Sequence, residues 1–254
     1  MTKHTLKARP EASIAPASTL GVHSEVGKLR EVLVHRPDLS LQRLTPDNCH
    51  ALLFDDVLWV KKARQEHDAF VDALRERGVT VIDFGTLLAE TMAIPEARTW
   101  LLEKRLSPTA IGADLAAELW PWLTEVPSDW LSHHLIGGIA RGEMPDKPRG
   151  LVARTLEQHE FVLPPLPNQL FTRDSSCWVY GGVCINPMFW MARRPEAANV
   201  AAVYRFHPRF TRETFETWWS LEDSPTGDPS MEGGDVMPIG KGNVLIGRSE
   251  RTSR

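Results

Sequence analysis

The sequence predicts an α/β fold in which units of short strands and helices are interrupted by a mainly helical segment. Short apolar runs rich in β-branched residues, such as Leu29–His35 and Val79–Phe84, enclose a segment with helical spacing. Helical patterns then follow one another over residues 88–157. Strand pairs separated by glycine turns return after residue 157. This recurrence indicates a repeated α/β module with a helical subdomain inserted into it.

Composition narrows the class of protein before any motif is considered. The 254 residues are 42% hydrophobic and 24% charged, which is typical of a globular chain. The formal net charge is −4 and no basic run is present, which argues against a nucleic-acid partner. No stretch approaches the roughly 20 apolar residues that a membrane span needs, and residues 1–20 contain no apolar core of a signal peptide. We therefore expect a cytoplasmic protein without a membrane partner.

Residues 21–87 are predicted to form the first α/β unit, after a flexible arm over residues 1–20. Strand Leu29–His35 is followed by a helix within Leu52–Glu76 and by strand Val79–Phe84. Gly78 is the expected C′ residue of that helix. Its apolar face is assigned to Val60, Ala63, Phe70, Ala73 and Leu74.

Residues 88–157 are predicted to be the helical insertion, with tryptophans as large apolar anchors. The expected helices are Leu87–Thr91, Glu96–Leu106, Thr109–Trp122 and Asp129–Ala140. A separate tandem domain is the alternative for this stretch, and the sequence alone leaves it open.

Residues 158–254 are predicted to return to α/β units that stop before the fold closes. The expected elements are a hairpin of Gln169–Tyr180 with Val183–Asn186 around Gly181-Gly182, helix Arg194–Phe206, and a hairpin of Asp235–Ile239 with Asn243–Ile246. No helix follows to cover the second hairpin.

The three cysteines are expected to be free thiols. A turn at Gly181-Gly182 places Cys177 opposite Asn186, so that Cys177 and Cys184 share a face diagonally, with Cβ atoms about 7–8 Å apart. That separation is too long for a disulfide. An odd count without CxxC spacing also argues against structural zinc. Cys49 lies in a polar loop and is expected to be inert.

Two acidic clusters, Asn168–Asp174 and Met231–Val236, occur at predicted strand ends beside turn residues. Two carboxylates that converge on one cleft suit a guanidinium, whose five N–H donors point in fixed directions. Each cluster also has an ordinary explanation. An Asp after an Arg is often a solvated pair, and Glu-Gly-Gly-Asp is a common start of a hairpin.

Several motifs, taken together and in order, resemble arginine deiminase, a member of the guanidine-modifying enzymes. They are Gly21–Pro37, Leu53–Val60, Leu166–Asp174, Met231–Val236 and Gly247–Arg251. The resemblance runs from about residue 20 to the last residue. It implies a pentein-type, five-bladed α/β propeller, incomplete in this chain, with the helical insertion that arginine deiminases carry at residues 88–157.

The resemblance also implies roles for particular residues. Asp174 and Glu232 match the carboxylates that grip the guanidinium nitrogens of L-arginine. The other matches are Asn168, Arg193 and Arg251 for the substrate α-carboxylate, Phe171 for an apolar wall beside the aliphatic stem, and Asp235 for a supporting role. For Arg193 the alternative is a solvated charge beside Arg194.

The implied reaction uses a cysteine nucleophile and a histidine general acid and base, with no cofactor and no metal. In the family both residues lie beyond the point where this sequence stops, so we expect this chain alone to be inactive. Cys177 is not expected to substitute, because strand alternation places it on the face opposite Asp174. The pair His133-His134 lacks the spacing of a metal site. The complete protein is expected to be a homo-oligomer.

Two alternatives remain at this point. Another guanidine hydrolase, acting on dimethylarginine or agmatine, is less consistent with the helical insertion and with the segment Ser249–Thr252. Agmatine also lacks the carboxylate that Arg193 would bind. A non-catalytic arginine-binding or interaction module on the same scaffold would need no nucleophile at all.

Overall fold

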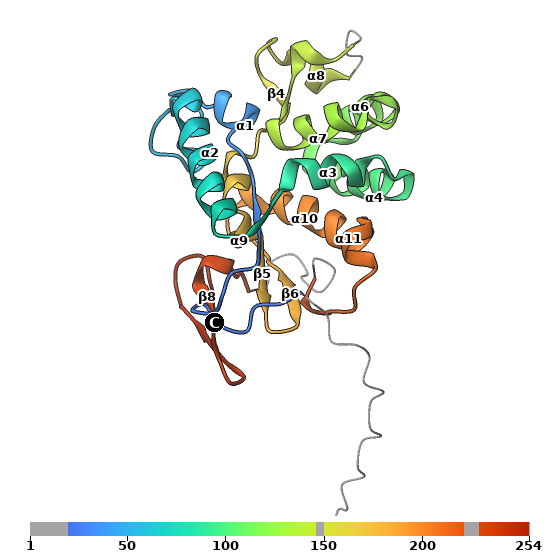
Figure 1. Ribbon diagram of the computed structural model, residues 1–254. Helices are drawn as coiled ribbons and strands as arrows, with labels where there is room; N and C mark the ends of the chain where they lie inside the picture. Colours follow the sequence, from blue (N-terminus) through green and yellow to red (C-terminus); the bar gives the residue numbers. More distant parts are fainter. Residues whose placement is uncertain (1–19, 146–149, 221–228, 254) are drawn as a thin grey trace, which may run out of the picture.

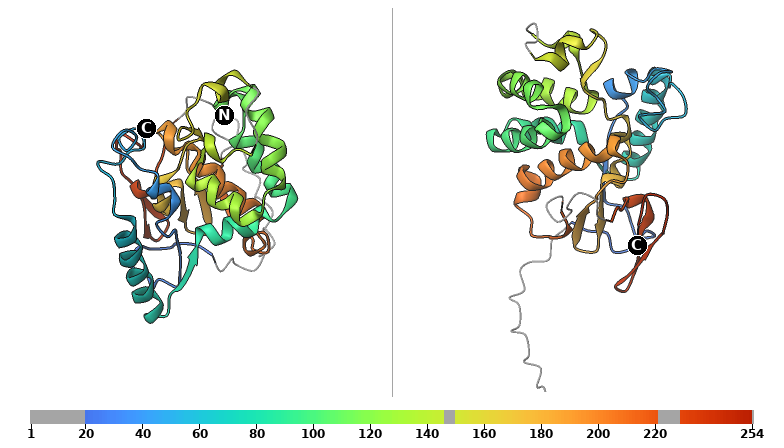
Figure 2. Two further views of the ribbon diagram at one scale, coloured as in Figure 1. Left: turned by 90° about the horizontal axis from the view of Figure 1, so that it is seen from above. Right: turned by 180° about the vertical axis from the view of Figure 1, so that it is seen from behind.

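The computed structural model describes residues 20–145, 150–220 and 229–253, so nearly all of the N-terminal arm predicted for residues 1–20 lies outside the described residues. These described residues form a mixed α/β structure with four small, separate sheets (Figure 1). Helices α3, α4, α6, α7 and α10 lie in a stack on one side of the central strands, and α2 lies on the other side, as Figure 2 also shows. Within the described part of the chain, no helix is long and apolar enough to cross a membrane.

The two strands and the helix expected within residues 21–87 are present. Strand β1 (Glu31–Val34) pairs in parallel with β2 (Thr80–Asp83), and helix α2 (Val60–Glu76) connects them after the short α1 (Leu39–Gln42). Gly78 follows α2 with a φ of +74°, which confirms the predicted helix end. The predicted apolar face was wrong at Phe70, which is 54% exposed, whereas the neighbouring Val71 is buried.

Residues 84–155 are mainly helical, but two glycines divide the predicted helices. Gly112, with a φ of +88°, separates two helices where one was expected, and Gly138, with a φ of +85°, ends a helix that was expected to continue to Ala140. Ile139–Ala140 instead forms β3, which pairs with β4 (Phe161–Leu163). The helical elements are α3 (Phe84–Met92), α4 (Pro95–Arg105), α5 (Pro108–Ile111), α6 (Ala113–Glu125), α7 (Ser128–Gly137), the 3₁₀ turn η1 (Arg141–Glu143) and α8 (Leu151–Thr155).

These helices share one hydrophobic core with later parts of the chain. Helix α10 (Arg194–Phe206), which has the predicted bounds, contributes most of its length to this core, and α11 (Pro208–Thr211) adds Phe210. The buried Arg105 of α4 crosses the core, and its Nη1 donates to Leu135 O and Asn199 Oδ1, each at 2.9 Å. The helical region is thus packed tightly onto the strand-bearing region.

The first predicted hairpin is present, but its two strands pair in a register that differs from the predicted one. Strand β5 (Ser176–Val179) pairs with β6 (Gly182–Ile185), and β7 (Glu216–Trp219), which was not predicted, adds to β6 in parallel. The turn is Tyr180-Gly181, with Tyr180 at a φ of +53°. Cys177 therefore lies directly opposite Cys184, so the predicted pairing of Cys177 with Asn186 was wrong. Both thiols are buried and free, as expected.

The strand expected from Gln169 to Ser175 was also wrong. This segment forms two short helical turns instead, the 3₁₀ turn η2 (Pro167–Leu170) and α9 (Thr172–Ser175), before β5 begins. Two further 3₁₀ turns, η3 (Met191–Arg193) and η5 (Gly233–Asp235), precede α10 and β8. The second hairpin, β8 (Val236–Gly240) with β9 (Asn243–Ile246), matches the prediction.

The two turn glycines allow a matched test of the corrected register. A Cβ on Gly182 would lie 2.5 Å from Trp218 Nε1 and 2.7 Å from Glu216 O, whereas a Cβ on Gly181 would meet nothing within 4 Å. We expect Gly182→Ala to lower the free energy of unfolding by about 1–3 kcal/mol through overpacking, and Gly181→Ala to change it little. Urea denaturation of both variants checks this. Equal effects of the two substitutions would contradict the register.

A second prediction concerns His35, which is buried at the end of β1. Burial lowers its pKa below the ordinary 6.5, although Asp83 and Asp38 act in the opposite direction. The unfolded chain therefore binds the proton more readily, and the stability that His35 provides is lost as the pH falls through about 6.5. We expect His35→Gln to reduce the loss of unfolding free energy between pH 8 and pH 5.5, as measured by urea denaturation at each pH. A pH dependence identical in His35→Gln and the parent would refute this assignment.

Candidate functional site

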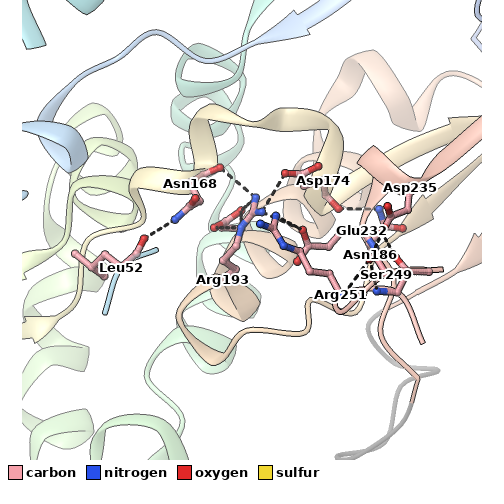
Figure 3. A network of polar contacts seen from close by, with 11 residues as sticks. Leu52, Asn168, Asp174, Asn186, Arg193, Glu232, Asp235, Ser249 and Arg251 are labelled. Carbon is pink, nitrogen blue, oxygen red and sulfur yellow. Dashed lines mark hydrogen bonds and ion pairs between the residues drawn. The ribbon is translucent and has the colours of Figure 1, made fainter. Parts of the chain in front are cut away.

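The candidate site forms where three segments that are distant in sequence meet. Asp174 lies on α9, Glu232 lies immediately before η5, and Arg193 ends η3 at the start of α10. Figure 3 shows the guanidinium of Arg193 between Asn168 on one side and the two carboxylates on the other. The two acidic clusters predicted from the sequence are thus brought together.

The guanidinium of Arg193 is the centre of the network. Its Nη1 lies 3.0 Å from Asp174 Oδ2 and 3.2 Å from Glu232 Oε2. Its Nε and Nη2 lie 3.1 Å and 2.9 Å from the two carboxylate oxygens of Glu196, and Nη2 also donates to Asn168 O at 3.3 Å. The Arg193 side chain is only 2% exposed. It is therefore not the solvated surface charge that the sequence left as an alternative.

Close backbone contact brings the second acidic cluster onto the first. Gly233 lies against Arg173 O and Cys177 Cβ, where any side chain would collide. The side chain of Arg173 stabilises this contact between the two segments. Its Nε donates to Gly233 O at 2.9 Å, and its Nη2 donates to Val236 O at 2.5 Å. Arg173 also pairs with Glu25, at 2.6 Å. The position of Glu232 beside Asp174 thus depends on a residue without a side chain at position 233.

Two asparagines position the backbone around Asp174. Asn186 Nδ2 donates to Asp174 O at 2.8 Å. The buried Asn168 donates through Nδ2 to Leu52 O at 2.7 Å, just before Leu53, which has a φ of +64°. The side chain of Asn168 therefore holds the loop at Leu52, while its carbonyl oxygen accepts from Arg193.

Residues 249–252 close the site from the C-terminal side. Arg251 Nη1 lies 3.2 Å from Glu232 Oε2, and its side chain is 52% exposed. Asp235 Oδ2 accepts hydrogen bonds from Ser249 Oγ and Thr252 Oγ1, both at 2.6 Å. Glu232 N in turn donates to Thr252 Oγ1 at 3.2 Å. Asp235 thus orders the turn that carries Arg251, and it does not contact Arg193.

Burial makes this cluster electrostatically unusual. Desolvation raises the pKa of Glu232 above its ordinary range, against the opposing charges of Arg193 and Arg251. Desolvation also raises the pKa of Glu196 to about 7. Burial alone would lower the pKa of Arg193, but its hydrogen bonds and charge interactions with Glu196 and Asp174 raise it. Glu232 Oε1 is buried without a hydrogen-bond partner among the described residues.

The predicted residues occupy different places around this network. Asp174, Glu232, Asn168, Arg193 and Arg251 come together, Asp235 supports Arg251, and Phe171 is 47% exposed in the loop between η2 and α9. The sequence reasoning missed Glu196, which is 0% exposed. An acidic residue three positions after Arg193, in the first turn of a helix, was the available signal.

None of the three cysteines faces this cluster as a nucleophile. Cys177 and Cys184 pack with Val236 in a small apolar core, and Cys49 belongs to another core beside Leu41 and Leu44. Cys177 Sγ lies 3.7 Å from Asn186 Nδ2. Over residues 20–145, 150–220 and 229–253, no group of three or more histidine, cysteine or acidic side chains is arranged to hold a metal ion.

Comparison with known protein families agrees with this arrangement. A family model described as arginine deiminase matches residues 50–254, which includes every residue of the network around Arg193. The match covers well over half of the chain. The chain therefore belongs to the arginine deiminase family.

Proposed function

We propose that this chain provides the guanidinium-binding part of an arginine deiminase site. In this proposal L-arginine is hydrolysed to citrulline and ammonia, and its guanidinium is held by Asp174 and Glu232. The observation that supports it best is that these two carboxylates already reach one guanidinium nitrogen, Arg193 Nη1, at 3.0 and 3.2 Å. A pair of acids that fits an internal guanidinium has the spacing needed for a substrate guanidinium.

The unpartnered oxygen of Glu232 supports the same proposal. A buried carboxylate oxygen without a hydrogen bond is costly, and native proteins seldom leave one without a reason. Among the residues that the structure describes, Glu232 Oε1 has no hydrogen-bond partner, and its side chain is 3% exposed. A bound guanidinium would donate to it in surroundings with little water, where charge-assisted hydrogen bonds are strong.

The residues that the family resemblance names would contact the rest of the substrate. Arg251 is half exposed next to Glu232 and could meet an anionic tail with its free donors. Arg193, Asn168 and Phe171 complete the proposed contacts to the α-carboxylate and the aliphatic stem. A tail contact of this kind favours L-arginine over agmatine, which has no carboxylate.

The proposed reaction proceeds through a covalent intermediate. A cysteine thiolate adds to the guanidinium carbon, and the C–N bond to a terminal nitrogen breaks as that nitrogen takes up a proton and leaves as ammonia. Water then adds to the amidino carbon, the C–S bond breaks, and citrulline and the thiol are released. The proposal requires a thiol from outside these 254 residues, because Cys49, Cys177 and Cys184 are all buried in apolar cores.

Family membership also suggests how the four small sheets fit into a larger fold. We propose that they belong to units of the five-bladed α/β propeller of the guanidine-modifying enzymes, with residues 88–157 as the helical insertion. The parallel pair β1–β2 connected by α2 supports this proposal, because it is one strand, helix, strand unit of the kind that the sequence pattern predicts to recur.

Binding of L-arginine to the purified chain tests the proposal. We expect calorimetry to detect binding, and we expect Asp174→Asn and Glu232→Gln each to weaken it about tenfold to a hundredfold, because each removes a charge-assisted hydrogen bond of about 1.5–3 kcal/mol. Glu66→Gln is the matched control, since Glu66 is an exposed acid on α2. Citrulline should not form.

The outcomes separate the alternatives. A folded chain that binds no arginine, or binds it equally well in all three variants, would sink the proposed site. Citrulline production by the purified chain would show that the missing thiol is not required. Addition of the missing thiol in a longer protein, without any turnover of arginine, would favour a non-catalytic binding module.

A further inference from the structure

The N–H donors of Arg193 fall into two groups that bind different carboxylates. Nε and Nη2 form a forked pair with the two oxygens of Glu196, at 3.1 and 2.9 Å. Nη1 alone reaches Asp174 and Glu232. One guanidinium is thus shared between an acid on its own helix and the two acids proposed to bind the substrate.

A substrate guanidinium would compete with Arg193 only for the two carboxylates that contact Nη1. It would need oxygens of Asp174 and Glu232, and it would bring a second positive charge next to Arg193 Nη1. Two like charges in a buried cluster repel strongly. Binding of arginine therefore requires Nη1 to give up contacts with the two carboxylates, whereas the contacts with Glu196 are not contested.

We propose that Glu196 is a positioning residue that holds Arg193 when arginine displaces Nη1 from Asp174 and Glu232. This inference rests on the proposed function of the same site. Glu196 keeps the Arg193 side chain anchored, and the freed Nη1 then faces the bound substrate. Without the charge of Glu196, Arg193 would bind the Asp174–Glu232 pair more firmly and would act as a competitor of the substrate.

The location of Glu196 suits this role. It lies in the first turn of α10, and its side chain is 1% exposed. Helix α10 is packed into the main core from the residue that follows Glu196 onward, through Ala197 and Val200 among others. Water cannot replace Arg193 as the partner of Glu196 at such a position, so the forked pair is held by burial as well as by charge.

The balance of charge provides an independent argument. Asp174, Glu196 and Glu232 carry three negative charges when ionised, and Arg193 and Arg251 carry two positive charges. Arg105 is a third positive group that interacts with Glu196, and burial raises the pKa of Glu196 to about 7, so the net charge of the cluster depends on the pH. Relative to the parent, loss of the Glu196 charge makes the cluster less attractive to an incoming guanidinium by one unit of charge, and loss of the Arg193 charge makes it more attractive by one unit.

Two variants with opposite expected effects test the inference, with methylguanidinium as a probe that has a head group and no carboxylate. We expect Glu196→Gln to weaken binding of methylguanidinium about tenfold or more, and Arg193→Gln to strengthen it by a similar factor. The double variant should return towards the parent. A merely structural role of the pair would weaken binding in both single variants. Calorimetric titration of each protein gives the dissociation constants, and a thermal unfolding scan confirms that each is folded.

The matched control is Glu90→Gln, because Glu90 is also paired, with His207 at 2.7 Å, but lies outside the cluster. If Glu196→Gln does not fold, Arg193→Gln and the double variant still give the sign of the effect. Methylguanidinium binding that weakens in Arg193→Gln, or that is as strong in Glu196→Gln as in Glu90→Gln, would overturn the inference. A folded parent chain that binds neither methylguanidinium nor L-arginine would instead overturn the proposed function, and the positioning role with it.

Discussion

The buried ion cluster around Arg193 is the constraint on which the rest of the site depends. A guanidinium that is 2% exposed needs acceptors for its N–H donors in place of water, and three carboxylates supply most of them here. Each carboxylate comes from a different part of the chain. The cluster can therefore form only when α9, the start of α10 and the segment before η5 have all reached their places. The site is therefore present only when these three segments of the fold are correctly placed.

The fold satisfies this constraint with backbone contacts more than with side-chain packing. Gly233 allows the second acidic segment to touch Arg173 O, and Arg173 secures that junction by bonding to backbone oxygens. Thr172 Oγ1 attaches α9 to β1 by donating to Leu33 O at 2.9 Å. Asp174 and Glu232 lie on or beside short helical turns and not in regular strands. Their carboxylates therefore point in directions that the alternation of side chains along a strand would not allow.

Sequence patterns predicted some features of this arrangement closely. Helix α10 and strand β9 have the expected bounds, β8 is shifted by one residue, and the two acidic clusters meet as expected. Other expectations failed where a tertiary contact outweighed the local pattern. Gly182 was assigned to the turn, but it lies in β6, where Trp218 packs against it, and the turn moves to Tyr180-Gly181. The role of Glu196 was missed because an acid at the start of a helix usually has an ordinary explanation in the helix dipole.

The sequence by itself determined the α/β class, the helix ends marked by Gly78 and the two segments that carry the acids, because these follow from local periodicity and from residues with special backbone freedom. Tertiary structure alone decided which atoms meet. It divided Arg193 between Glu196 and the Asp174–Glu232 pair, left Glu232 Oε1 without a hydrogen-bond partner in the described part of the chain, and set Cys177 opposite Cys184. The physical reason is that burial and charge compensation depend on segments far apart in the chain, and no local pattern records their distance in space.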